Sequence, residues 1–401
     1  MSKRHILVVS QYFYPEPFRI NDMCQEWVKR GYKVTVLTGL PNYPEGKIYK
    51  GYKKKDKKRE TWNGIDIIRI PLLPRGKGGI RLILNYLSFV ISGFFWKIFT
   101  KVKADMVFSY EVSPMTQVLV GCWYAKRRKI PHYLYVQDLW PENVEIVTGI
   151  RSKLVINPIS RMVNKIYKRC NLIFATSESF VTEIQKRVFD NKEKVKYWPQ
   201  YAEEFYQPTE SRVDELMSDQ AFKIIFTGNI GQAQGLNILP QTAKLLKEQN
   251  KNVKFVIVGD GREKDKLMEA IHACDVGKMF ILISRKPAEE IPKYLCSCQA
   301  AFVSFMDNEL FAKTIPAKLQ SYMACGMPIV ASAIGETERI IQDADCGVCV
   351  KIGDVESLAL AIDELLNKED IAILGANAKS YFDKHFNKEI LMDEMDKYLG
   401  E

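Results

Sequence analysis

The sequence predicts an α/β protein built from two doubly wound parallel sheets. Segments rich in β-branched residues alternate with helical stretches through both halves of the 401-residue chain, and its length is that of two domains. Two prolines and a run of polar residues interrupt this alternation at 194–213. We therefore expect one domain at 1–205 and another at 206–380. A last helix, at about 380–401, can pack back on the first domain or stay with the second.

Six strands are expected in each half, because each half has six apolar runs of strand length. In the first half they are 5–10, 33–39, 65–71, 106–110, 132–138 and 171–177. In the second half they are 222–229, 253–260, 278–284, 300–305, 328–333 and 346–351. The last helix is indicated by apolar residues that recur at helical spacing, at 382, 386, 390, 391, 395 and 399.

Charge is distributed unevenly between the halves. Residues 1–200 contain 36 Lys and Arg against 16 Asp and Glu, whereas residues 201–401 contain 22 against 32. The basic half carries apolar and aromatic residues and no nucleic-acid-binding motif, so we expect an anionic membrane surface as its partner and no nucleic acid. The apolar run that begins at His5 is short and lacks a cleavage site, which favours a first strand over a signal peptide.

Residues 80–99, IRLILNYLSFVISGFFWKIF, form the most apolar stretch of the chain. Basic clusters flank it at 49–59, 75–79 and 101–103. A helix of this length can span a membrane, but its internal polar residues make it a poor spanning segment. The pattern favours an interfacial helix on anionic lipid, with a buried core helix as the alternative. We thus expect a cytoplasmic protein, peripherally attached to the inner face of the cell membrane.

The nine cysteines are scattered and lie mostly in apolar segments, as in reduced cytosolic proteins. Two close pairs, Cys296 with Cys298 and Cys346 with Cys349, have no histidine within ten residues. Buried thiols explain these pairs better than metal ligands do. The sequence therefore predicts no metal and no cofactor.

Two glycine-rich turns in the second half follow expected strands and precede expected helices. The first runs from Gly228 to Gly235 and the second from Gly259 to Arg262. Glycine lets the backbone approach phosphate oxygens, and a helix N-terminus supplies N–H donors, although a tight turn also needs glycine for its geometry alone. Because both turns end parallel strands, they are expected at one sheet edge. Neither carries the dinucleotide fingerprint with its later acidic residue, which argues against NAD.

A third stretch, 315–332, predicts a helix that is entered through Pro316 and closed by Gly326 as its C-cap, followed by a buried strand. The first turn of this helix can present N–H groups and Lys318 to a diphosphate. The alternative is an ordinary solvated helix lysine.

Taken in order, these motifs resemble glycosyltransferase family 4, whose members are retaining enzymes of the GT-B fold. The matching second-half pieces are the three stretches above, and those of the first half are 11–22, 33–52, 135–142, 175–180 and 194–208. The resemblance implies two Rossmann-like domains facing a central cleft, with a nucleotide-sugar donor bound mainly by the second domain. It also implies that the donor phosphate takes the acceptor proton, so no enzyme nucleophile is required.

This sequence departs from the family at its charged positions. Asn229 and Gln234 stand where members commonly have Arg and Lys, and Lys313 and Ser321 stand where many have two glutamates. We expect Lys313 and Lys318 to restore positive charge beside the diphosphate. The donor-binding residues implied are Gly228, Asn229, Gly231, Gln234, Gly235, Gly259, Gly261, Arg262, Arg285, Lys286, Lys313, Thr314, Lys318 and Ser321.

The first half then supplies the acceptor and sugar side. The resemblance implies Tyr14, Glu16, Asn21 and Asn42 as acceptor-side residues, and Asp138 and Glu142 as the catalytic carboxylates that contact sugar hydroxyls. For Asp138 the alternative is a cap of the following helix.

The variant motifs resemble the branch that includes N-acetyl-L-fucosaminyl transferases of O-antigen, lipopolysaccharide and capsule assembly. This branch implies a UDP-linked N-acetylated sugar and a lipid-linked, polyprenyl-pyrophosphate acceptor. Two alternatives stay open: another activity on this fold, such as a UDP-sugar 2-epimerase, and a non-catalytic nucleotide-sugar-binding subunit of a glycan-assembly complex.

Overall fold

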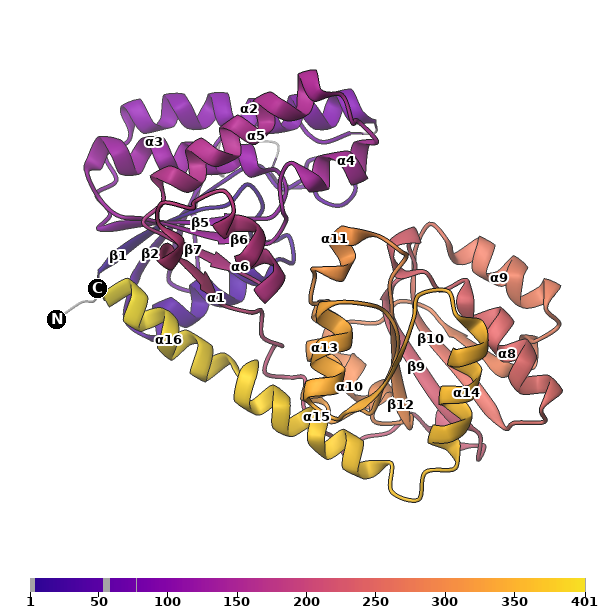
Figure 1. Ribbon diagram of the computed structural model, residues 1–401. Coiled ribbons are helices and arrows are strands. Elements are labelled where there is room, and N and C mark those ends of the chain that lie inside the picture. Colours follow the sequence, from indigo (N-terminus) through magenta and orange to yellow (C-terminus); the bar gives the residue numbers. More distant parts are fainter. Residues whose placement is uncertain (1–3, 53–57, 77, 401) are drawn as a thin grey trace. The chain divides into compact units, whose positions relative to one another are not determined.

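A computed structural model describes residues 4–52, 58–76 and 78–400 (Figure 1). The chain divides into two compact units, Met1–Trp198 and Pro199–Glu401. Both are layered α/β structures, and the point of division falls inside the interruption that the sequence shows at 194–213. Parts of two of the three predicted basic clusters, residues 53–57 and Lys77, lie outside the described residues.

The first unit contains an eight-stranded sheet in the order β3-β4-β2-β1-β5-β6-β7-β8. Its strands are β1 His5–Val9, β2 Lys33–Thr38, β3 Arg59–Trp62, β4 Ile65–Arg69, β5 Met106–Glu111, β6 His132–Val136, β7 Leu172–Ala175 and β8 Val195–Tyr197. The helices are α1 Arg19–Lys29, α2 Gly79–Phe99, α3 Val118–Arg128, α4 Glu142–Thr148, α5 Lys153–Arg169 and α6 Glu178–Gln185.

Two of these eight strands were not predicted, so the expectation of six strands in this half was wrong. β3 pairs antiparallel with β4 at one edge of the sheet, and β8 forms the other edge. Both are short, and β3 alternates between exposed and half-buried residues. Such edge strands lack the continuous apolar run that marks a strand covered on both faces.

The centre of the first sheet is fully buried. The side chains of Ile6, Leu7, Val8 and Val9 are inaccessible to solvent, because the parallel strands are covered on both faces. Helices α2, α3 and α5 lie together in the layer on one of these faces (Figure 1). Strand order reverses at β1, so the topological switch point lies between the carboxyl ends of β1 and β5, where open α/β sheets bind ligands.

The second unit contains a six-stranded parallel sheet in the order β11-β10-β9-β12-β13-β14. The strands are β9 Phe222–Asn229, β10 Val253–Asp260, β11 Phe280–Ile283, β12 Ala300–Ser304, β13 Ile329–Ser332 and β14 Gly347–Val350. The helices are α7 Asp214–Met217, α8 Ile238–Glu248, α9 Lys264–Ala273, α10 Ile291–Leu295, α11 Glu309–Ala312, α12 Ala317–Ala324, α13 Glu336–Asp343, α14 Val355–Leu366, α15 Ala372–His385 and α16 Lys388–Gly400. All six predicted strands are present, and the strand order is that of a Rossmann fold with its switch point between β9 and β12.

The expected last helix is two helices. α15 ends at His385 and α16 begins at Lys388, and between them the Asn387 side chain accepts a hydrogen bond from the Ile390 amide at 3.3 Å. At the start of α16, the Lys388 ammonium pairs with Glu204 at 2.8 Å. That α16 packs on the first unit stays a prediction.

Helix α2 corresponds to the apolar stretch 80–99, and most of it is exposed. Only a stripe of Asn85, Phe89 and Gly93 is buried among its described residues. A Cβ on Gly93 would lie 2.4 Å from a methyl of Val120, so the helix rests closely on α3 along this stripe. Its length and the mean hydropathy of 1.6 in its most apolar 18-residue window would allow it to cross a membrane, and 17% of that window is buried. The helix therefore packs on the core along its inner stripe, where Phe89 is buried, while its outer face is exposed.

Candidate active site

The two predicted glycine turns of the second unit form one surface. β9 and β10 are neighbours in register, so Gly228 lies beside Gly259. A Cβ on Gly259 would lie 1.9 Å from the Gly228 carbonyl oxygen, and one on Gly261 would lie 2.1 Å from the Ile230 carbonyl oxygen. These glycines are therefore required by backbone packing, whatever else they do. The result is a stretch of closely packed main chain at the carboxyl ends of the central strands.

Lys318 lies under this surface without an ionic partner in the described part of the chain. Its Nζ is 3.9 Å from the centroid of the Phe226 ring and 4.0 Å from where a Cβ on Gly228 would stand. Burial lowers the pKa of Lys318 to about 7. The alternative of an ordinary solvated helix lysine is thus wrong, because the ammonium points inward beside the switch point, with the ring face as its main contact.

Helix α12 holds Lys318 in this position through Tyr322. The Tyr322 hydroxyl accepts a hydrogen bond from the Thr227 amide at 2.8 Å and donates to the Thr227 carbonyl at 3.3 Å. Because Thr227 directly precedes Gly228, these bonds tie the helix to the end of β9. The helix begins at Ala317 after Pro316, and Gly326, predicted as the C-cap, lies one residue past the C-cap Cys325 in the left-handed region with φ of +67°.

The remaining predicted donor residues follow the carboxyl ends of β9, β10, β11 or β12. The Gln234 side chain accepts a hydrogen bond from the Gly231 amide at 3.1 Å, which closes the first glycine turn. The Thr314 and Ser321 hydroxyls donate to carbonyls four residues earlier in the chain, at 2.9 and 3.1 Å. Toward a ligand, both hydroxyls can therefore act only as hydrogen-bond acceptors. Asn229, Gly235, Arg262, Arg285, Lys286 and Lys313 are exposed or half-buried at this edge.

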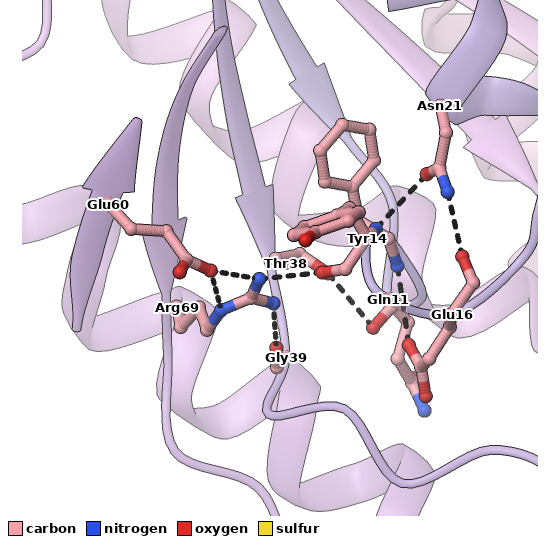
Figure 2. Close-up of polar contacts among 9 residues, drawn as sticks. Gln11, Tyr14, Glu16, Asn21, Thr38, Gly39, Glu60 and Arg69 are labelled. Carbon is pink, nitrogen blue, oxygen red and sulfur yellow. Dashed lines mark hydrogen bonds and ion pairs between the residues drawn. The ribbon is translucent and has the colours of Figure 1, made fainter. Parts of the chain in front are cut away.

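In the first unit, the predicted acceptor-side residues come together in one hydrogen-bonded pair of loops. The buried carboxylate of Glu16 accepts from the amides of Asn42 and Tyr43, both at 2.7 Å. Asn21 accepts from the Tyr14 amide at 3.1 Å and donates to the Glu16 carbonyl at 2.7 Å (Figure 2). Burial raises the pKa of Glu16 to about 6. Since its carboxylate faces the loops themselves, Glu16 fastens the loop after β1 to the loop after β2.

The Tyr14 ring is held against the sheet edge that the sequence did not predict. It stacks on Trp62 of β3, with ring centroids 4.2 Å apart. Arg69 of β4 donates to the Tyr14 carbonyl at 2.6 Å and forms an ion pair with Glu60 of β3, and Figure 2 shows both contacts. Strand β3 therefore positions the loop that bears Tyr14.

The two predicted catalytic carboxylates have different surroundings. Asp138 accepts a hydrogen bond from the Ser113 amide at 2.8 Å, so it links the ends of β5 and β6. It does not cap the next helix, since Pro141 is the N-cap of α4. Glu142 instead pairs with Arg187 at 2.8 Å, and Arg187 also donates to Ser160 of α5.

Glu111 is a site residue that sequence reasoning missed. It ends β5 at the switch point and is fully buried, and its Oε2 accepts from the Asp138 amide at 3.2 Å. Its Oε1 has no hydrogen-bond partner among the described residues. Burial, and next the Asp138 carboxylate, raise the pKa of Glu111 well above its usual range, and burial also raises that of Asp138. The only signal in the sequence is one acid at the end of an apolar strand.

Family models match both units of the chain. Residues 19–200 match the model described as Glycosyltransferase Family 4, and residues 208–381 match the model described as Glycosyl transferases group 1. This chain is a glycosyltransferase. The two matched segments meet near the division between the two compact units.

Relatives of this glycosyltransferase include bacterial enzymes of polysaccharide biosynthesis. The putative colanic acid biosynthesis glycosyl transferase WcaI of Escherichia coli K12 is 25% identical over 392 residues, 91% of each chain. The amylovoran biosynthesis glycosyltransferase AmsK of Erwinia amylovora is 25% identical over 184 residues, so the match spans 45% of each protein. N-acetyl-alpha-D-glucosaminyl L-malate synthase of Bacillus anthracis is 20% identical over 278 residues, 66% of this chain and 71% of that one.

Solved structures share the GT-B fold of this glycosyltransferase. Sucrose-phosphate synthase from Thermosynechococcus elongatus superposes with a TM-score of 0.75 at 15% identity, over 99% of this chain and 98% of that one. Anabaena HepE in complex with UDP-glucose superposes with a TM-score of 0.70 at 14% identity, over 99% of this chain and all of HepE. The predicted pair of Rossmann-like domains is thus confirmed.

Proposed function

We propose that this glycosyltransferase moves a sugar from a UDP-linked donor to a lipid-linked acceptor in the assembly of a cell-surface polysaccharide, with retention at the anomeric carbon. The observation that carries the donor site is the position of the Lys318 ammonium, which lies beneath the glycine turns and has no ionic partner among the residues that the structure describes. Support for UDP comes from HepE, which was solved with UDP-glucose on the same fold. The names of WcaI and AmsK support a polysaccharide product.

In this proposal the second unit holds the diphosphate. The main-chain surface around Gly228 and Gly259 allows phosphate oxygens to approach, and Lys318 supplies a cation that is poorly solvated in the free protein. A charge-assisted hydrogen bond of this kind contributes about 1.5–3 kcal/mol. Lys313, at the C-cap of α11, is the second cation of the site. Together they replace the Arg and Lys for which this chain has Asn229 and Gln234.

The first unit holds the acceptor. Glu111 and Asp138 lie at its switch point. Burial raises the pKa of Glu111, which favours the protonated form of that carboxyl, the form that can donate a hydrogen bond. Neither carboxyl is assigned as a nucleophile. In a retaining reaction on one face of the sugar, the donor phosphate takes the acceptor proton as the new glycosidic bond forms and the bond to phosphate breaks.

The exposed apolar face of α2 supports attachment to the inner face of the cell membrane. Large apolar side chains along it are 39–77% exposed: Ile80, Ile83, Leu84, Leu87, Ile91, Phe94, Phe95, Ile98 and Phe99. Such a contiguous apolar surface with cationic flanks binds an anionic lipid surface. A hollow of about 630 Å³ near the start of this helix is lined by Lys47 and Arg81, which suit an acceptor pyrophosphate, and also by Glu45. Flotation with anionic liposomes tests the attachment, and absence of binding at low salt would refute it.

Turnover tests the transfer itself. The full-length protein is incubated with UDP-, GDP- and ADP-sugars, N-acetylated sugars included, and with short polyprenyl-pyrophosphate glycans, and the products are identified by mass and anomeric configuration. We expect a product from a UDP-sugar with the donor's configuration. Exclusive use of GDP- or ADP-sugars would reject the donor assignment, and an inverted product would reject retention. The names of relatives such as the N-acetylglucosaminyl malate synthase support an N-acetylated sugar.

A further inference from the structure

Two cysteines and a histidine that are far apart in the sequence meet inside the first unit. They are Cys122 in α3, His132 at the start of β6 and Cys170 at the C-cap of α5. Their sulfur and nitrogen atoms all lie within 4.8 Å of one another, and all three side chains are buried. Neither thiol is in a disulfide. Spacing along the chain gave no indication of this cluster, which is separate from the cysteine pairs considered above.

The distances suit a tetrahedral metal ion. With Zn–S of about 2.3 Å and Zn–N of about 2.0 Å, the S···N separation between two ligands is about 3.5 Å and the S···S separation about 3.8 Å. The Cys170 sulfur lies 3.7 Å from His132 Nδ1. All three ligand atoms lie within 4.8 Å of one another, so small movements would bring them to these separations, and the fourth tetrahedral position is left for a water molecule.

The surroundings hold the ligands in place. The other ring nitrogen of His132, Nε2, lies 2.8 Å from the Ser109 hydroxyl, which is the kind of outer partner that orients a metal-bound imidazole. Asn171, next to Cys170, exchanges two hydrogen bonds with the His132 main chain, at 2.8 and 2.9 Å. Gly121 lets α3 approach closely, since a Cβ there would lie 2.5 Å from Ser109 Oγ and 2.9 Å from His132 Nε2.

We propose that Cys122, His132 and Cys170 bind one zinc ion. Two thiolates and a neutral imidazole around Zn²⁺ form a group without net charge, which a buried position tolerates, and thiolate and imidazole are ligands that zinc prefers. The ion would join α3, β6 and α5, and β6 leads to Asp138 at its carboxyl end. The zinc site does not depend on the proposed transfer reaction.

Metal content tests the proposal directly. The full-length protein is produced with zinc in the medium, freed of loose metal by gel filtration and analysed by mass spectrometry of the elements. We expect about one zinc per chain in the wild type and near none in Cys122→Ser and Cys170→Ser. Cys24→Ser is the matched control, because Cys24 is fully buried in the same unit and is not part of the cluster. It should retain its zinc.

Two measurements on the wild type keep the test decisive if the cluster variants fail to fold. Replacing zinc by cobalt should produce thiolate-to-cobalt absorption in the near ultraviolet. In mild denaturant, zinc should protect Cys122 and Cys170, but not Cys24, from alkylation, and a chelator should abolish the protection. Wild type with less than about a tenth of an ion per chain after zinc loading would overturn the proposal. So would zinc retained in folded Cys122→Ser or Cys170→Ser.

Discussion

Replacing Lys318 by methionine is expected to stabilise the protein and to weaken its binding of UDP. The ammonium lies half-buried against the Phe226 ring, and burial lowers the pKa of Lys318 to about 7, against about 10.4 for a lysine in the unfolded chain. That difference corresponds to a cost of at most about 4 kcal/mol at pH 7, and to about 2 kcal/mol once partial access of water is allowed for. Methionine fills the same space without charge.

The gain in stability should depend on pH. Between pH 7 and about 10.4 the unfolded chain binds a proton at Lys318 that the folded protein does not, so wild-type stability rises with pH across this window. The free energy of unfolding of Lys318→Met should therefore exceed that of the wild type by the full amount below pH 7, and this difference should vanish near pH 10. Urea unfolding at pH 7 and pH 9 measures it.

Loss of UDP binding should accompany this gain. Removing one charge-assisted hydrogen bond of about 1.5–3 kcal/mol raises Kd about 10- to 150-fold, which calorimetry with UDP at pH 7 can resolve. Lys278→Met is the matched control, since Lys278 is exposed at the opposite, amino-terminal end of β11 and should leave Kd unchanged. If Lys318→Met bound UDP within twofold of wild type, or unfolded at lower urea, the assignment of Lys318 would be wrong.

Burial at Glu16, close packing at Gly259 and exposure at Phe95 each lead to a measurable effect. Burial raises the pKa of Glu16 to about 6 in the folded protein, above its usual value of 4.5. The free energy of unfolding of the wild type should therefore fall by about 2 kcal/mol as the pH rises from 4.5 to above 6, and that of Glu16→Gln should not. The same pH dependence of urea unfolding in both proteins would contradict this. Gly259→Ala places a Cβ 1.9 Å from a carbonyl oxygen and should lower the free energy of unfolding, measured by urea unfolding, by at least about 2–3 kcal/mol. Gly277→Ala is the control: a Cβ there has no atom within 4 Å, so its free energy of unfolding should lie within about 0.5 kcal/mol of the wild-type value. Phe95→Ser should reduce liposome binding about tenfold without lowering the melting temperature. Leu360→Ser, at a similarly exposed position on α14, should leave liposome binding unchanged. Equal binding by the two variants would show that α2 does not contact the membrane.

Twelve of the strands could be predicted from the sequence, because a parallel strand that is covered on both faces consists of a continuous run of apolar residues. The two that were missed, β3 and β8, are edge strands held by main-chain pairing, which leaves little trace in the side-chain pattern. The missed strand β3 matters for the site because Trp62 supports Tyr14. The glycine turns were also predictable, since strand, turn and helix follow one another locally.

Other parts of the site depend on residues that are distant in the chain. Glu142 was predicted as a sugar-side carboxylate, and its ion pair with Arg187, which is forty-five residues further along the chain, could not be read from the sequence. Glu111 became a candidate only when strand order placed the end of β5 at the switch point. The zinc ligands join three elements that no local motif connects.

By itself, the sequence determined the α/β class, the two units and the glycine turns, because strand burial and turn geometry are local requirements on residue type. Only the tertiary structure decided the strand orders, the burial of Lys318 under Gly228 and the exposure of α2. Those features arise from packing between segments far apart in the chain, and a side chain's burial and pKa depend on the neighbours that this packing brings to it.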